Sequence, residues 1–154
     1  MSANESPAHP ASTMPLTAPA TIVVGLDGSQ MSSRAVAYAG LLATALGSEV
    51  VAVHAVGLLS TIDGETRPSD QVRDEIQAAV DRWAKPLEVA GARYRTVLED
   101  GPPGLVLLRL IERTDAGMAV LGTRGIGSAD GVVLGSTSHH LVQHSPVPVL
   151  VVTH

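Results

Sequence analysis

The sequence contains no cysteine, which excludes disulfides, thiolate metal sites and thiol nucleophiles. It also has no phenylalanine and a single tryptophan, Trp83, so a surface that stacks nucleic-acid bases on aromatic rings is not expected. Positive charge is scarce, because Lys85 is the only lysine and the formal net charge is −5. An acidic chain repels a polyanion, and nucleic acid is therefore not an expected partner.

Long apolar runs are missing as well. None approaches the roughly 20 residues that a helix needs to cross a membrane, and the first residues lack a basic stretch followed by an apolar one. We therefore expect a soluble, cytoplasmic protein without membrane contact. Residues 1–20 are rich in proline and have no helix or strand period, which predicts a disordered tail before one folded domain, residues 21–154.

The folded part alternates apolar runs with amphipathic stretches. Strands are predicted at 21–26, 49–56, 92–98, 118–121 and 147–152, and helices at about 30–46, 72–87, 105–113 and 136–144. Ser29 is the expected N-cap of the first helix, Pro86 should interrupt the second, and residues 57–68 are expected to form a polar loop. The alternation predicts an α/β domain, a three-layer sandwich with a parallel sheet between two helix layers.

Two polar turns that contain glycine follow the first and fourth predicted strands. They are Asp27-Gly28-Ser29 and the segment 122–135. The carboxyl ends of parallel strands lie on one edge of a sheet, where ligands bind in such folds. If the two strands are neighbours, the turns face each other across one crevice.

The second turn has the composition of a phosphate-binding loop. It connects a buried strand to a helix, where small residues let the backbone approach an anion and the first N–H groups of the helix point at it. Arg124 contacts phosphate or points to solvent; the residues leave both open. No lysine follows the glycines, so this is no P-loop, and we expect nucleotide binding without catalytic residues. The expected contacts are Gly122, Thr123, Arg124, Gly125, Gly127, Ser128, Gly135, Ser136, Thr137 and Ser138.

Three features together resemble the universal stress protein family, in its nucleotide-binding branch, over about residues 21–154. The first strand ends in Val-Gly-Leu-Asp-Gly-Ser at 24–29. The loop has a glycine, two residues, a glycine, nine residues, then glycine and serine, at Gly122, Gly125, Gly135 and Ser136. The chain closes with a proline-led last strand, residues 144–152.

The resemblance implies an adenine nucleotide alpha hydrolase-like fold, with a five-stranded parallel sheet in the order 3-2-1-4-5. It also implies a homodimer through the last strand, Val147 to Val152, and a role in stress response or dormancy. ATP, with or without Mg²⁺, is the implied cofactor, hydrolysed slowly or not at all. Alternatives on the same scaffold are a cyclic AMP or AMP sensor, a slow ATPase and a nucleotide-free dimer module.

The family also suggests roles outside the loop. Asp27, after Gly25 and Leu26, would accept hydrogen bonds from ribose or the adenine amino group, although a turn-capping role remains open. Val53 would form a wall for the adenine or be an ordinary core residue. Gly101 would admit a ligand or serve only as a turn.

His139, His140 and His144 are expected to be helix-surface residues rather than a metal site.

Overall fold

A computed structural model describes residues 16–123 and 134–153. Its strands are β1 (Thr21–Gly25), β2 (Glu49–Val56), β3 (Leu59–Ile62), β4 (Glu65–Pro68), β5 (Arg93–Asp100), β6 (Met118–Gly122) and β7 (Val149–Val152). Its helices are α1 (Gln30–Leu46), α2 (Arg73–Trp83), α3 (Lys85–Val89), α4 (Pro103–Thr114) and α5 (Ser136–His144), with a 3₁₀ turn at Ser69–Gln71. None of the helices described is long and apolar enough to cross a membrane.

The main sheet has five strands in the order β5-β2-β1-β6-β7, and every pairing in it is parallel. In terms of the five predicted strands this order is 3-2-1-4-5, so the predicted topology is confirmed. The first and fourth predicted strands are β1 and β6, which pair directly with Val23 opposite Ala119. The turns that follow these two strands therefore begin side by side.

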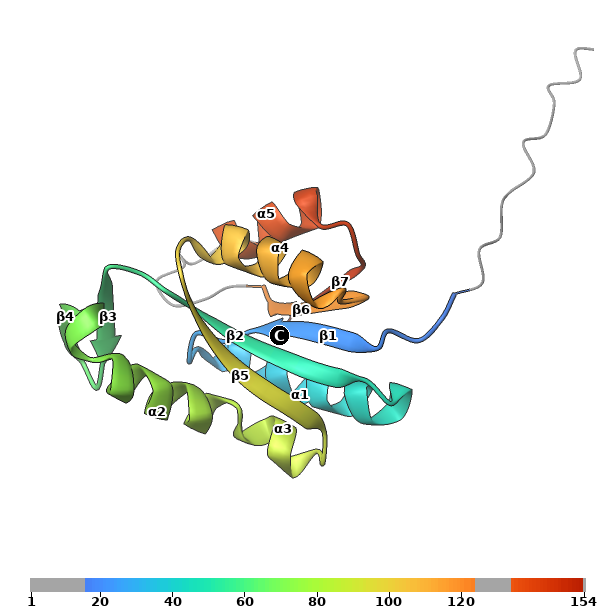
Figure 1. The fold of residues 1–154 in the computed structure, drawn as a ribbon, viewed down its shortest axis with the longest axis horizontal. Helices are drawn as coiled ribbons and strands as arrows, with labels where there is room; N and C mark the ends of the chain where they lie inside the picture. Colours follow the sequence, from blue (N-terminus) through green and yellow to red (C-terminus); the bar gives the residue numbers. More distant parts are fainter. Residues whose placement is uncertain (1–15, 124–133, 154) are drawn as a thin grey trace, which may run out of the picture.

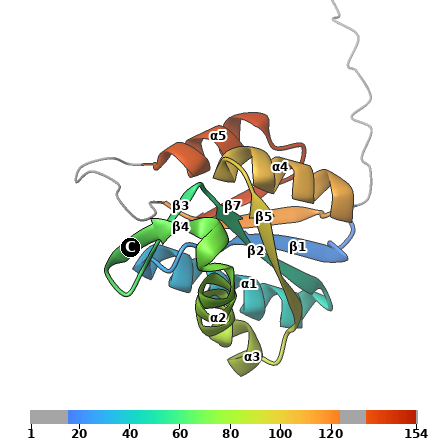
Figure 2. The same cartoon turned by 60° about the vertical axis from the view of Figure 1, so that its left-hand side comes forward.

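Helices cover both faces of the sheet, as predicted. The helices α1, α2 and α3 lie on one face, and α4 and α5 lie on the other (Figures 1 and 2). Each face of the sheet has its own hydrophobic core, and neighbouring residues of β1 point into different ones. Val24 packs with α1 and α2, whereas Val23 packs with α4. Burial on both faces explains why the central strands are continuous apolar runs.

The helix ends follow from local sequence. The Ser29 side chain accepts a hydrogen bond from the Ser32 backbone N–H, which makes it the N-cap of α1 as predicted. Gly47 ends that helix in the left-handed conformation, with φ +71°. The predicted interruption near Pro86 is present, because α2 ends at Trp83 and α3 starts at Lys85.

The prediction of a polar loop at residues 57–68 was wrong, because this segment contains the antiparallel hairpin β3–β4. Asp63 and Gly64 connect the two strands with φ values of +52° and +83°. Tight two-residue hairpin turns require such positive φ values. Thr61 opposes Thr66 and their hydroxyls are 2.7 Å apart. Ile62 packs against the core beneath α2, so the hairpin is tied to the helix that follows it.

Several element boundaries differ by one or two residues from expectation. The last strand begins at Val149 rather than Val147, because the Ser145 hydroxyl bonds to both backbone groups of Val147 and holds it in a turn. At the other end, the backbone carbonyls of Pro19 and Ala20 accept hydrogen bonds from residues 48 and 49. The rest of the expected tail, residues 1–15, lies outside the described residues.

The two edges of the sheet differ in chemistry. On edge strand β5, Arg95 lies 3.7 Å from a Glu49 carboxylate oxygen, and Arg93 donates to the backbone carbonyl of Gly47. The opposite edge is the apolar strand β7, in which Leu150 is 36% exposed. Charged side chains on an edge strand oppose pairing with another strand, and β5 carries several of them, whereas β7 has none.

Candidate functional site

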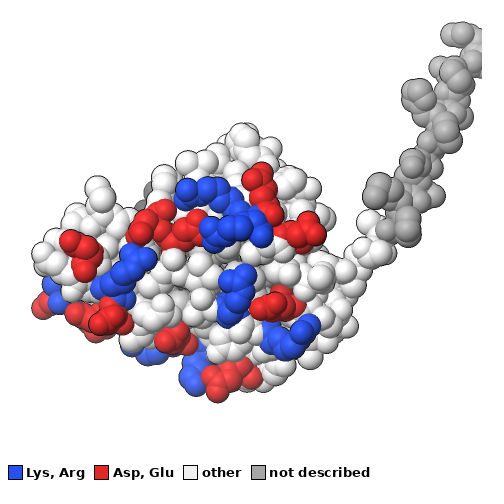
Figure 3. Space-filling model, in the orientation of Figure 1, with Lys and Arg blue, Asp and Glu red and all other residues white. Residues whose placement is uncertain are grey.

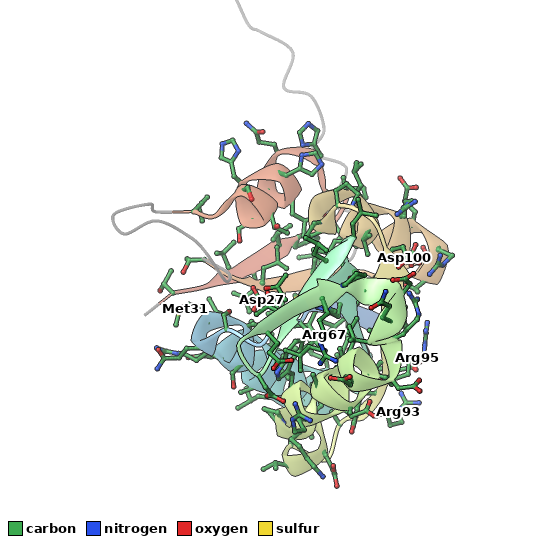
Figure 4. The ribbon with its side chains drawn as sticks, turned by 90° about the vertical axis from the view of Figure 1, so that its left-hand side faces the viewer. Asp27, Met31, Arg67, Arg93, Arg95 and Asp100 are labelled. Atoms are coloured by element: carbon green, nitrogen blue, oxygen red, sulfur yellow. The ribbon has the colours of Figure 1, made fainter. Side chains whose placement is uncertain are left out.

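A cavity of about 440 Å³ lies at the carboxyl edge of the sheet, in the size range of small-molecule sites. The ends of β1, β2 and β6 form its floor, and the hairpin, α2, α4 and the start of α5 form its walls. Figure 4 views the molecule from this end, with Asp27 near the middle and Met31 of α1 beside it. The cavity is thus where the sequence predicted the crevice to be.

The structure brings most of the predicted site residues together. Those that line the cavity are Gly25, Leu26, Asp27, Val53, Gly122, Gly135, Ser136, Thr137 and Ser138. Gly101 and Thr123 do not line it. Gly101, which follows β5, instead donates its N–H to the carbonyl of Val56 at the end of β2. Four others, Arg124, Gly125, Gly127 and Ser128, lie outside the described residues.

Asp27 sits in a turn that α1 holds tightly. One of its carboxylate oxygens accepts a hydrogen bond from the Ser29 N–H at 2.9 Å, and its own N–H donates to the Ser32 hydroxyl at 3.2 Å. The same hydroxyl lies 3.2 Å from the Gly25 carbonyl. Asp27 therefore has the turn-capping role that the sequence left open, and it faces the cavity at the same time.

The opposite wall is the amino end of α5. Gly135 is its N-cap in an extended conformation, and no side chain caps the helix. The first helical hydrogen bond runs from the His139 N–H to the Gly135 carbonyl, so the N–H groups of Ser136, Thr137 and Ser138 have no partner within the helix. All three residues line the cavity, which gives this wall the partial positive charge of a helix start.

Gly122 has a packing role that the sequence did not reveal. A Cβ built at this position would lie 2.7 Å from the Met31 Cβ and 2.8 Å from the Met31 carbonyl carbon. The carbonyl of Gly122 accepts a hydrogen bond from the buried Ser138 hydroxyl at 2.6 Å. Glycine at the end of β6 thus lets the first turn of α1 approach the strand.

Sequence reasoning expected Val53 of β2 in the wall of the cavity but missed the contributions of His54, the hairpin and α2. His54 and Trp83 line the cavity, together with the hairpin segment 59–62. The sequence predicts that His54 is a packed or hydrogen-bonded residue, and it contacts the Leu26 carbonyl and the Trp83 ring. Trp83 was expected in the core but is only partly buried. The Asp-Gly turn was the one signal in the sequence that would have located the hairpin.

Few charged side chains line the described part of the cavity. Asp27 is the only carboxylate among the described residues of the lining, and no lysine or arginine lies there. Within residues 16–123 and 134–153, no group of three potential metal-binding side chains occurs. Basic and acidic residues are interspersed on the face drawn in Figure 3. Where the chain is described, backbone groups and hydroxyls therefore supply the binding chemistry.

The model of the universal stress protein family matches residues 20–153. The chain belongs to the universal stress protein family. Two relatives are 32% identical to it: the universal stress protein in the QAH/OAS sulfhydrylase 3′ region of Thermus aquaticus, over 133 residues, and the universal stress protein YxiE of Bacillus subtilis, over 143 residues. These alignments cover 86% and 85% of this chain and 97% of each relative.

Solved structures of universal stress proteins share the fold. A crystal structure of a universal stress protein in complex with cAMP is 28% identical, with a TM-score of 0.72, and the match covers 89% of this chain and 98% of that one. The family membership and this likeness agree with the doubly covered parallel sheet described above. The universal stress protein fold therefore accounts for nearly the whole described chain.

Proposed function

We propose that this universal stress protein is an ATP-binding regulator of stress response or dormancy that hydrolyses its nucleotide slowly or not at all. One observation carries the proposal: Asp27 and the uncapped start of α5 line the same cavity from opposite sides. A carboxylate suits hydrogen-bond donors of ribose or adenine, and a helix start suits phosphate. The two ends of a nucleotide thus have complementary partners across one cavity.

The residues present fit this ligand. Ser136 and Thr137 would bind phosphate through their N–H groups and hydroxyls, and Val53 would contact the base from the end of β2. Hydrogen bonds to a charged group contribute about 1.5–3 kcal/mol each, so a few of them can hold a phosphate without a lysine.

The same lining supports the proposal of slow or absent hydrolysis. Asp27 is the only carboxylate that the described part of the cavity offers to a magnesium ion or an attacking water, and its Oδ1 accepts a hydrogen bond from the Ser29 N–H. Phosphoryl transfer relies on positioned cations and a residue that orients the nucleophile. The described side chains supply neither a lysine nor an arginine there. We therefore expect binding and release to carry the function.

A charge placed at Ser136 tests the phosphate position. Ser136 is exposed in the first turn of α5, where an aspartate stabilises a helix by about 0.3–1 kcal/mol but repels phosphate. Ser136→Asp should therefore raise the free energy of unfolding slightly while lowering ATP affinity at least tenfold in calorimetric titration. Adenosine, which has no phosphate, should bind as it does to the wild type.

The uncharged variant Ser136→Asn is the matched control, and it should keep ATP affinity within about threefold of the wild type. An equal loss of ATP and adenosine affinity in Ser136→Asp would place the phosphate elsewhere. A wild-type protein that binds no adenine nucleotide at all would refute the proposed function.

Cyclic AMP is a second candidate ligand. The solved relative in complex with cAMP supports it, and so does the absence of lysine and arginine from the described lining, because a cyclic monophosphate carries less charge than a triphosphate. Competition between ATP and cyclic AMP for the purified protein separates the two. A clear preference for cyclic AMP would make the protein a cyclic-nucleotide sensor.

We further propose that two copies pair through β7 and that the protein acts in the cytoplasm. The apolar, unprotected edge of β7 supports the dimer, and family membership supports the location. Light scattering measures the first, and fractionation of cells that express the protein measures the second. A monomeric mass or a membrane fraction would contradict these proposals.

A further inference from the structure

Trp83 reaches the nucleotide cavity from the side of the sheet opposite α5. It is the last residue of α2, which lies on the α1 face of the sheet (Figure 2). His54 comes from β2 and points to the same face, because its neighbours Val53 and Ala55 pack on the α4 side. Both rings nevertheless line the cavity that contains Asp27.

The Trp83 indole lies directly against the turn that carries Asp27. A Cβ built on Gly28 would lie 2.5 Å from the indole Cζ2 and 2.6 Å from Cε2. Gly28 also has φ +78°, a conformation that residues with a Cβ rarely adopt. Position 28 therefore requires glycine both because of its backbone conformation and because the Trp83 indole leaves no room for a Cβ.

His54 holds the residue before Asp27. Its Nδ1 lies 2.8 Å from the Leu26 carbonyl oxygen, and because a carbonyl only accepts, Nδ1 carries the proton and donates. The His54 and Trp83 rings meet edge to face, with centroids 5.3 Å apart and planes at 71°, a favourable aromatic arrangement. The two rings thus form one unit that contacts the chain on both sides of Asp27.

The turn is held from its other side by α1, through the hydrogen bonds of Ser29 and Ser32 to Asp27. The rings supply the opposing contact. Without the indole, Gly28 would lose its packing partner, and the turn would be held only by α1 and by the hydrogen bonds of Leu26 to β2. A small displacement of a carboxylate weakens every hydrogen bond that it accepts from a ligand.

We propose that Trp83 is a positioning residue which, with His54, fixes the Asp27 carboxylate for the hydrogen-bond donors of a nucleoside and so sets the selectivity of the cavity. This inference rests on the proposed function, because it concerns the same ligand. It adds that selectivity for the base and ribose depends on α2, a helix outside the glycine-rich loop. Trp83 acts through Asp27 and needs no contact with the ligand.

A double-mutant cycle between Trp83 and Asp27 tests the inference. Asp27→Asn keeps the Oδ1 that accepts from Ser29 and removes the negative charge. Trp83→Leu should lower ATP affinity about tenfold in the wild-type background, but less than twofold in the Asp27→Asn background, because coupled residues are not additive. Equal losses in both backgrounds would overturn the proposal, since Trp83 would then act independently of Asp27.

Selectivity provides a second measurement. ITP lacks the 6-amino donor, and 2′-deoxy-ATP and 3′-deoxy-ATP each lack one ribose hydroxyl. The wild type should prefer ATP to at least one of these, and Trp83→Leu should reduce that preference toward equal binding. Trp83→Phe, which retains an aromatic ring, should restore part of it. An unchanged preference in Trp83→Leu would contradict the proposed role.

Val80 provides the matched control. It lies one turn earlier on α2, is fully buried and does not line the cavity. Val80→Ala should lower the free energy of unfolding while ATP affinity and selectivity stay unchanged. If it reduces affinity as much as Trp83→Leu, the effect of Trp83 is one of general stability and the proposal fails.

A measurement without ligand separates this inference from the proposed function. Amide relaxation by NMR reports the order of residues 27–29 in the unliganded protein. Trp83→Leu should lower their order parameters toward the range below about 0.6 that marks flexible backbone, whereas Val80→Ala should not. A turn that stays rigid in Trp83→Leu would overturn the positioning role, whatever the wild type binds.

Discussion

Gly122 at the end of β6 lies so close to Met31 in the first turn of α1 that a Cβ at position 122 would be 2.7 Å from the Met31 Cβ. The neighbouring atoms include the Met31 backbone, which cannot rotate away as a side chain can. The glycine that begins the glycine-rich pattern of the sequence is therefore also required for packing. Loss of nucleotide binding on replacing Gly122 would not by itself identify a ligand contact.

We accordingly expect Gly122→Ala to lower the free energy of unfolding by about 1–3 kcal/mol, the usual cost of overpacking. Chemical denaturation measures this. Gly57→Ala is the matched control, because the nearest atom to its added Cβ would be 3.7 Å away, so its stability should change little. Equal stability of Gly122→Ala and the wild type would contradict the close approach of α1 to β6.

Ser29→Ala should lower the free energy of unfolding by about 1 kcal/mol, because it removes the N-cap of α1. Ser29→Asp keeps a capping oxygen and should remain close to the wild type. Thermal and chemical unfolding of the two variants provide the comparison. If the two were equally destabilised, the cap would not be the source of the effect.

Gly64→Val should destabilise the hairpin β3–β4, because Gly64 has φ +83° and a β-branched residue is strained there. Hydrogen exchange should show faster exchange of the amides that pair β3 with β4. Amides between β1 and β2 should be unaffected, since the hairpin forms a separate sheet. Protection that is unchanged in both regions would argue against the hairpin turn.

Nucleotide binding should change the fluorescence of Trp83. It is the only tryptophan of the chain and lines the cavity, so its emission reports the site without a label. Titration with ATP should shift or quench the emission with the same dissociation constant as calorimetry. A calorimetrically saturated protein with unchanged emission would place the ligand away from the α2 wall.

Leu150→Lys should convert the proposed dimer into a monomer, because a charge on the apolar edge of β7 opposes strand pairing. Val89→Lys is the matched control, since it adds the same charge at an exposed position at the end of α3. Light scattering of both variants measures the mass. A dimer that survives in Leu150→Lys would move the interface elsewhere.

The parallel sheet with helices on both faces could be predicted because its strands are apolar on both faces. Val23 and Val24 illustrate this, since they fill opposite cores. The resemblance to a known family supplied the strand order. The hairpin was missed because its strands are four residues long and largely exposed, so they have no apolar period to detect.

The candidate site was predicted in part. Residues at strand ends, such as Asp27, were located because the carboxyl ends of parallel strands meet at one edge. Trp83 and His54 were not located, because their place in the cavity depends on where α2 ends and on which face of β2 carries the histidine. The packing of Gly122 against Met31 depends on a contact between elements that the sequence does not encode locally.

The arginine-anchored edge at β5 has a consequence for assembly. If copies pair through β7 as proposed, each molecule extends its sheet at that edge alone, because the charged strand β5 opposes pairing, and the neighbour uses its own β7 for the same contact. Growth by strand addition then stops after a single step, so crowding in the cell should not drive these molecules into filaments.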